Sequence, residues 1–143
     1  METKEIVQKA INQVSQSLFD HLWSKRKNDL TVKDKEFIDN FSEKLEEDLT
    51  LTLDYLKKEG IDPRGDIKMN YIFHDSGKDQ CLLNIIFHSK QGLVNRDLVI
   101  ITIMKNLMEF VNNFTDGDGV IEIISFKKLE QRNLLSFEVL YSI

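Results

Sequence analysis

Three histidines are the side chains best suited to metal binding or proton transfer, and their positions keep them apart. His74 and His88 fall in two strand-like runs. Pairing those runs as a hairpin separates them by about seven pairs, more than about 20 Å at the strand rise, with His88 opposite Asp66. His21 lies at the flank of the apolar stripe of a predicted helix. We therefore expect no metal site, no catalytic residues and no cofactor.

The single cysteine and one Asp-Gly segment are the next candidates for chemistry. Cys81 lies on the apolar face of a predicted strand, whereas a reactive thiolate needs a polar or cationic setting. Asp116 to Gly119 reads Asp-Gly-Asp-Gly. With Gly119 at the glycine position of an EF-hand loop, Phe114 and Ser125 would take the first and last ligand positions, and neither is a carboxylate. We expect a turn there, and a protein that is not an enzyme.

Negative charge is concentrated in one stretch of the chain. The 143 residues include 19 Lys and Arg against 24 Asp and Glu, for a net charge of −5. Eight of the acids fall between Asp34 and Asp54, where only two lysines occur. Nucleic-acid affinity depends on basic side chains, so nucleic acid is not an expected partner. An acidic face instead attracts a basic protein, and we expect its contacts to be Glu43, Glu46, Glu47 and Asp54.

A part of the chain from Ile103 to Val139 resembles a known family. Ile103-Met-Lys-Asn-Leu-Met-Glu-Phe-Val, then Gly119-Val-Ile-Glu-Ile and Leu135-Ser-Phe-Glu-Val, are similar to the helix and hairpin around the first ATP-lid region of histidine-kinase-type ATPases. The resemblance implies a phosphotransfer domain with His21 as phospho-acceptor. Phe110 replaces the second Asn of the family, and the sequence contains no Asp-x-Gly-x-Gly nucleotide motif. A histidine phosphotransfer or degenerate kinase-like domain is therefore the alternative interpretation.

Apolar residues recur every three or four positions in the first 60 residues, which predicts two helices. The second begins at a capping pair, Thr31 and Asp34, and ends at Gly60. Strict alternation over residues 49–53 also fits a strand, but the helix stop signal that follows favours a helix. Leu51 and Tyr55 lie off the main apolar stripe, which indicates that the last turns are enclosed on several sides.

Alternating apolar residues predict two β-hairpins. The first joins Asp66–His74 to Gln80–His88, and the second joins Val120–Phe126 to Leu134–Ile143. Centring the first hairpin on Gly77 collects its apolar side chains on one face. The pairs on that face are Phe73 with Cys81, Tyr71 with Leu83, Met69 with Ile85, and Ile67 with Phe87.

The most apolar window, Asn95–Phe114, predicts a helix buried over most of its circumference. A strand over residues 97–103 is the competing interpretation. We expect the helix to cover the apolar face of the hairpins. Its one polar, solvent-facing stripe would consist of Thr102, Lys105, Asn106 and Glu109.

These elements predict an α+β fold: an N-terminal antiparallel helical hairpin (1–62) followed by a ββαββ unit (63–143), whose four-stranded antiparallel sheet is covered by helix 95–114. Each hairpin helix would be about 40 Å long. A nine-residue strand reaches only about 30 Å. The hairpin should therefore extend past its own sheet and pack against a second copy, as a homodimer.

The chain contains no window with the ~18–20 apolar residues of a membrane span. Its first residues read as a polar helix, and its single cysteine fits a reducing compartment, so we expect a cytoplasmic protein. The leading hypothesis is a non-enzymatic protein-binding module, such as a small acidic chaperone, adaptor, immunity or inhibitor-type protein. It would act through a dimeric helical hairpin and its acidic face. A sensor with a small-ligand pocket under the core helix is a third possibility.

Overall fold

The computed structural model describes residues 2–25, 27, 29–72, 80–89, 94–115, 120–128 and 134–142. The fold is α+β and begins with two helices, as the sequence predicts. The elements follow one another in the order α1 (Thr3–Lys25), α2 (Val32–Lys58), β1 (Ile61–Pro63), β2 (Lys68–Ile72), β3 (Gln80–Ser89), α3 (Arg96–Thr115), β4 (Val120–Lys128) and β5 (Leu134–Ser142).

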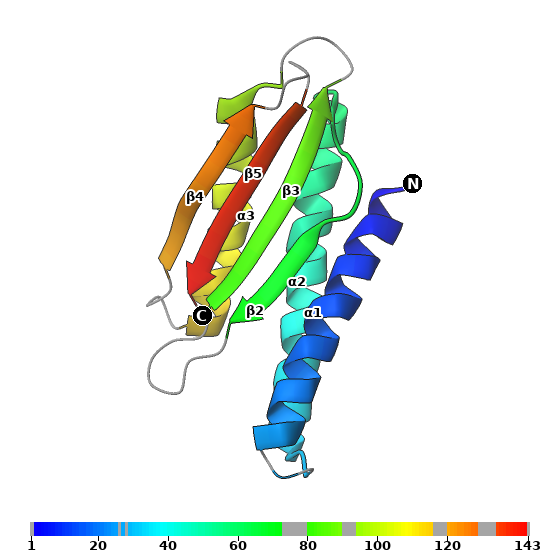
Figure 1. Ribbon diagram of the computed structural model, residues 1–143, viewed down its shortest axis with the longest axis vertical. Coiled ribbons are helices and arrows are strands. Elements are labelled where there is room, and N and C mark those ends of the chain that lie inside the picture. Colours follow the sequence, from blue (N-terminus) through cyan, green and yellow to red (C-terminus); the bar gives the residue numbers. More distant parts are fainter. Residues whose placement is uncertain are drawn as a thin grey trace.

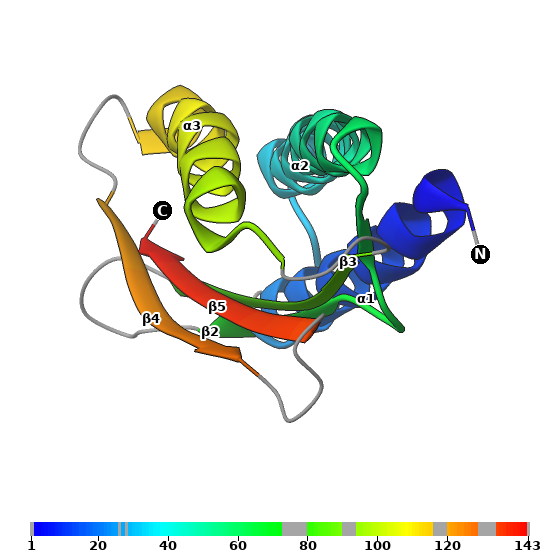
Figure 2. The same ribbon diagram turned by 90° about the horizontal axis from the view of Figure 1, so that it is seen from above.

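The strands form one antiparallel sheet with α2 and α3 side by side on one face (Figures 1 and 2). The order is β1-β3-β5-β4, and β2 also pairs with β3. The described residues form five strands and not the expected four, because β1 is an additional strand. β3 is ten residues long and β2 only five, so part of the outer edge of β3 is left for Ile61–Pro63. α1 packs against α2 and β2.

The pairing of β2 with β3 is displaced by two residues from the expected register. Tyr71 lies opposite Cys81 and Met69 opposite Leu83, where the sequence indicated Leu83 and Ile85. A shift of two keeps every residue on its expected face, because side chains alternate with a period of two. Alternation therefore fixes the face of each residue and leaves its partner on the other strand open. The expected pairs of Phe73 and His74 lie outside the described residues.

The helix boundaries follow the local signals in the sequence. The Thr31 hydroxyl accepts from the Asp34 amide, and the Asp34 carboxylate accepts from the Thr31 amide, which closes the predicted capping box. Gly60 follows α2 with φ at +79°, a conformation that costs little only for glycine. The Asn95 side chain caps α3 by accepting from the Leu98 amide at 3.1 Å. Residues 49–53 and 97–103 are thus helical, and the strand interpretations are wrong.

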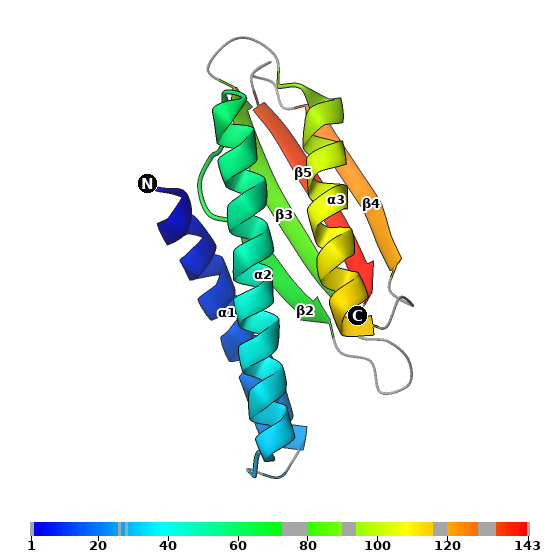
Figure 3. The ribbon, with the colours of Figure 1, turned by 180° about the vertical axis from the view of Figure 1, so that it is seen from behind.

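The core lies between the helices and the inner face of the sheet. On β3, residues 81, 83, 85, 87 and 89 are buried while the intervening ones are half-exposed. Cys81 is fully buried, as expected for an inert thiol. The far end of the α1–α2 hairpin extends beyond the strands (Figures 1 and 3). The largest fully buried side chains are Phe41, Phe87, Leu18, Leu45, Leu49, Leu53, Leu56, Ile67 and Leu83.

Candidate functional site

The outer side of the helical layer carries a groove between α2 and α3. The two helices run antiparallel (Figure 3), so the end of α2 lies beside the start of α3. They are joined beneath the groove by a hydrogen bond in which the Asn106 amide donates to the Thr52 hydroxyl at 2.7 Å. Thr52 donates in turn to the backbone carbonyl of Asp48 at 2.8 Å. This chain of bonds fixes the spacing of the two helices.

Apolar side chains line the groove and are unusually exposed. Leu51, Tyr55 and Ile101 expose 57%, 47% and 65% of their surface. The groove has a volume of about 590 Å³. The lining residues are Leu51, Asp54, Tyr55 and Lys58 from α2, and Leu98, Ile101, Thr102, Lys105 and Asn106 from α3.

The sequence patterns predicted the opposite environment for several of these residues. Leu51 and Tyr55 were expected to be enclosed, and they are exposed. Ile101 was expected in the buried part of its helix and Thr102 in the polar, solvent-facing stripe, yet Thr102 is buried and Ile101 is not. The reason is that α2 packs beside α3 on the sheet, which rotates the buried sector of α3 towards α2. Thr102 tolerates burial because its hydroxyl donates to the Leu98 carbonyl at 2.7 Å.

Three of the four acidic residues expected to contact a partner lie along the exposed outer crest of α2. Glu43, Glu47 and Asp54 are all exposed, and Asp54 also lines the groove. Glu46 is half-buried on the side of α2 that faces α1. It follows Ser42 by one turn, and the Ser42 hydroxyl is hydrogen-bonded to Ser15 of α1 at 2.5 Å. We call Glu43, Glu47 and Asp54 the acidic crest.

Asp48 is a buried carboxylate that the sequence does not single out. Its side chain is 3% exposed, and it is close enough to α3 for the charge of Glu109 to act on it. Its Oδ1 is 3.7 Å from the Lys44 ammonium. Its Oδ2 has no hydrogen-bond partner among the described residues. Burial raises the pKa of Asp48 to about 6, Lys44 opposes this rise, and the negative charges of Glu109 and Glu47 add to it.

Neither His21 nor His88 lines the groove, and His74 and the Asp116–Gly119 segment lie outside the described residues. His21 is half-buried on α1 and already contacts another residue, so its role as phospho-acceptor stays a prediction. His88 lies opposite Asp62 and not, as expected, opposite Asp66, since β1 occupies that end of β3. In the part of the chain that the structure describes, no group of three or more His, Cys, Asp and Glu side chains could hold a metal ion.

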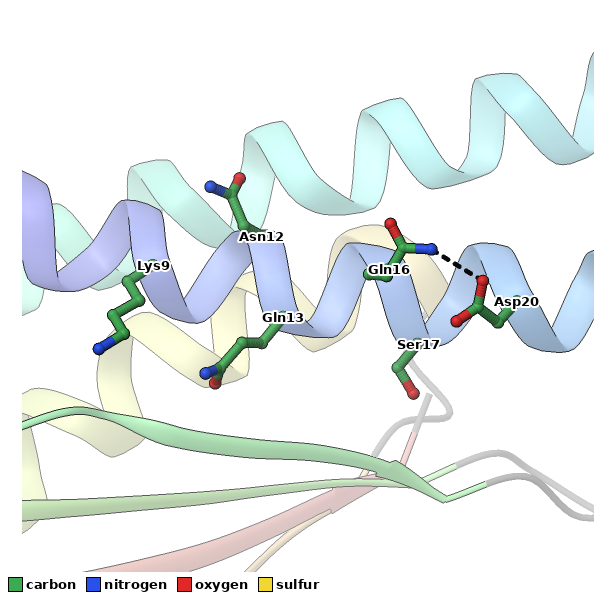
Figure 4. A pocket seen from close by; sticks show the side chains of 6 residues that line it. All are labelled: Lys9, Asn12, Gln13, Gln16, Ser17 and Asp20. Atoms are coloured by element: carbon green, nitrogen blue, oxygen red, sulfur yellow. Dashed lines mark hydrogen bonds between the residues drawn. The ribbon is translucent and has the colours of Figure 1, made fainter.

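A second hollow, of about 600 Å³, lies along α1 and is lined by polar side chains (Figure 4). Several of its polar groups are bonded within the protein: Gln16 donates to Asp20 at 2.8 Å, and Lys9 forms an ion pair with Asp66 at 2.8 Å. Gln13 and Ser17 project to the side of α1 that faces the strands in this view. Its lining residues are all of polar or charged types, whereas a ligand site is usually lined by hydrophobic and aromatic side chains.

The projecting end of the hairpin exposes an aromatic pair. Phe19 and Trp23, one turn apart on α1, stack with their ring centroids 5.8 Å apart. They expose 39% and 41% of their surface. Aromatic side chains of this kind are frequent anchors of protein interfaces.

Comparison with known proteins adds no relative. No protein-family model, curated protein or solved structure matches the chain. Among the described helices, none combines the length and the apolar character needed to cross a membrane.

Proposed function

We propose that this protein is a non-enzymatic protein-binding module. It acts through the acidic crest of α2 and through a dimeric helical hairpin. The division into a partner-binding hairpin (1–62) and a sheet-and-helix unit (63–143) with a ββαββ order is part of this proposal. It fits the classes of small acidic chaperone, adaptor, immunity or inhibitor-type protein.

The distribution of exposed apolar side chains carries this proposal. Among the residues whose side-chain burial the structure describes, which exclude those of β4 and β5, six large hydrophobic side chains are exposed, and they lie on the three helices. Five of them form two clusters, Phe19 with Trp23 and Leu51 with Tyr55 and Ile101. Clustered exposed apolar residues bordered by charge are typical of protein interfaces, whereas single ones are not informative.

We propose that the hairpin end holds the dimer contact. A stable interface buries about 800 Å² per partner around a few aromatic anchors. Phe19 and Trp23 supply such anchors on a segment that the sheet does not cover. Light scattering after size exclusion should give a dimer, and Trp23→Ser should give a monomer with the same circular dichroism. A monomeric native chain at micromolar concentration would contradict the dimer.

The acidic crest is tested by capture of the partner. The tagged full chain is used to purify partners from the native host, and these are identified by mass spectrometry. Replacing Glu43, Glu46, Glu47 and Asp54 by Lys should abolish capture of a basic protein, because the attraction that steers it is reversed. The matched control replaces Glu36 and Asp39, exposed acids nearer the start of α2, and should retain capture. Equal capture by both variants and the native chain would refute the role of the acidic residues.

A further inference from the structure

The groove between α2 and α3 is long enough to bind a short helix. It extends along α2 from Leu51 to Lys58 and along α3 from Leu98 to Asn106. At the helical rise these segments are about 10–12 Å long, which corresponds to about two turns. A helix that lies in a groove anchors itself through residues at positions i, i+3 or i+4, and i+7, and two turns supply these positions.

The polar groups at the base of the groove already have partners. The Thr102 hydroxyl donates to Leu98, and the Asn106 amide donates to Thr52. An apolar occupant therefore leaves neither of these donors unsatisfied when it excludes water. The exposed apolar surface that remains consists of Leu51, Tyr55 and Ile101, with the charged side chains of Asp54, Lys58 and Lys105 around it. This composition favours the apolar stripe of an amphipathic segment.

The openness of the groove favours a large convex occupant. A small-molecule site buries about 70–90% of its ligand, which requires walls that surround it. Here the three apolar side chains each expose about half of their surface or more, at 57%, 47% and 65%. A small molecule would remain largely in water on this surface. A helix would cover all three side chains from the open side.

Charges of both signs line the groove, Asp54 on the side of the acidic crest and also Lys58 and Lys105, while the acidic crest itself carries negative charge only. Glu43 and Asp54 of the acidic crest form no ion pair within the described residues, and Glu47 is 3.9 Å from Lys44, which also lies near Asp48. A second copy of this chain, with its net charge of −5, would present the same acidic surface. A segment with a basic flank would instead place opposite charge along the crest.

We propose that the α2–α3 groove binds an amphipathic helix of a protein partner, with its apolar face on Leu51, Tyr55 and Ile101 and its basic flank along the acidic crest. This inference rests on the proposed function. It adds where the partner binds and what kind of segment the partner presents.

The test uses a synthetic helical peptide as the probe. Its sequence consists of leucine and lysine, with leucines in one helical stripe, over about 18 residues, because shorter helices are marginal in water. A second peptide has the same composition in scrambled order, and a third replaces every lysine with glutamate. Binding to the full chain is followed by fluorescence anisotropy. The striped leucine–lysine peptide should bind, and the other two should bind at least about tenfold more weakly.

Variants of the full chain locate the binding. Ile101→Asp should lower the affinity for the striped peptide at least about tenfold, because the substitution places a charge in the apolar contact. The double variant Glu47→Lys, Asp54→Lys should lower the affinity for the striped peptide by a similar factor, and it should make this affinity less dependent on salt concentration. Val32→Asp is the control, since Val32 is 72% exposed at the other end of α2, and it should leave binding unchanged. Circular dichroism establishes that each variant is folded.

Three results would overturn the proposal. Equal binding of striped and scrambled peptides would show attraction to charge alone. Unchanged binding to Ile101→Asp would place the peptide elsewhere. A native dimer that Ile101→Asp dissociates would assign the groove to a second copy. None of these three results contradicts the proposed function as long as the lysine replacements in the acidic residues still abolish capture of the host partner. The proposed function itself fails if those replacements have no effect on capture.

Discussion

Replacing Asp48 by Asn should stabilise the protein at neutral pH and not in acid. Asp48 is almost fully buried, and its pKa is raised from 3.8 to about 6. A carboxyl whose pKa is raised by folding favours the folded state when it is protonated. Its contribution to stability is therefore lost as the pH rises from about 4 to about 6, and the loss is complete above that range. Asparagine has a similar shape and no such titration.

The size of the effect follows from the change in pKa. One pKa unit corresponds to about 1.4 kcal/mol, so a rise from 3.8 to about 6 corresponds to about 3 kcal/mol. The advantage of Asp48→Asn over the native chain should grow by up to this amount between about pH 4 and about pH 7. The pKa of about 6 already includes the opposing effect of the Lys44 cation, so the ion pair needs no separate allowance.

Urea denaturation followed by circular dichroism, repeated across this pH range, measures the difference. Asp39→Asn is the matched control, because Asp39 is an exposed acid on the same helix, and it should change stability by less than about 0.5 kcal/mol. Lys44→Met removes the cation that lowers the pKa of Asp48. This variant should therefore destabilise the protein at neutral pH, the opposite of the effect of Asp48→Asn. A difference between Asp48→Asn and the native chain that does not vary with pH would refute the reasoning.

Other predictions concern the fold. Thr31→Ala removes one half of the capping box and should cost about 1 kcal/mol of unfolding free energy, measured by urea denaturation. Gly60→Ala should cost about 1 kcal/mol in the same assay, because φ is +79° although no atom lies near an added Cβ. Phe41→Ala should cost about 3–5 kcal/mol, whereas Ile101→Ala on the exposed groove should cost less than about 1 kcal/mol. The Cys81 thiol should react with a thiol reagent only after unfolding, and rapid labelling of the native chain would contradict its burial.

Features encoded by neighbouring residues could be predicted from the sequence. The Thr31–Asp34 capping box and the stop at Gly60 need only a few consecutive positions, and both are confirmed. Alternation placed Cys81 on the buried face of β3 in the same way. The register of β2 against β3 was wrong by two residues because a period of two cannot distinguish such registers.

The candidate site depends on contacts between distant segments, and for that reason the sequence showed only part of it. Asp48 reads as one more acid on a charged helix, since Lys44 is four residues before it, and its burial appears only when the elements pack together. The same packing makes Thr102 a buried residue and Ile101 an exposed one. The acidic crest could be anticipated from composition, but its position beside an apolar groove could not.

Site-specific crosslinking tests partner binding at the groove most directly. A photoreactive phenylalanine derivative replaces Ile101 in the full chain, expressed in the native host, and in a second variant it replaces the exposed Val32. Irradiation should join position 101, and not position 32, to one host protein, and the crosslinked segment should be an amphipathic helix with a basic flank. Adducts at neither position, or equally at both, would contradict partner binding at the groove.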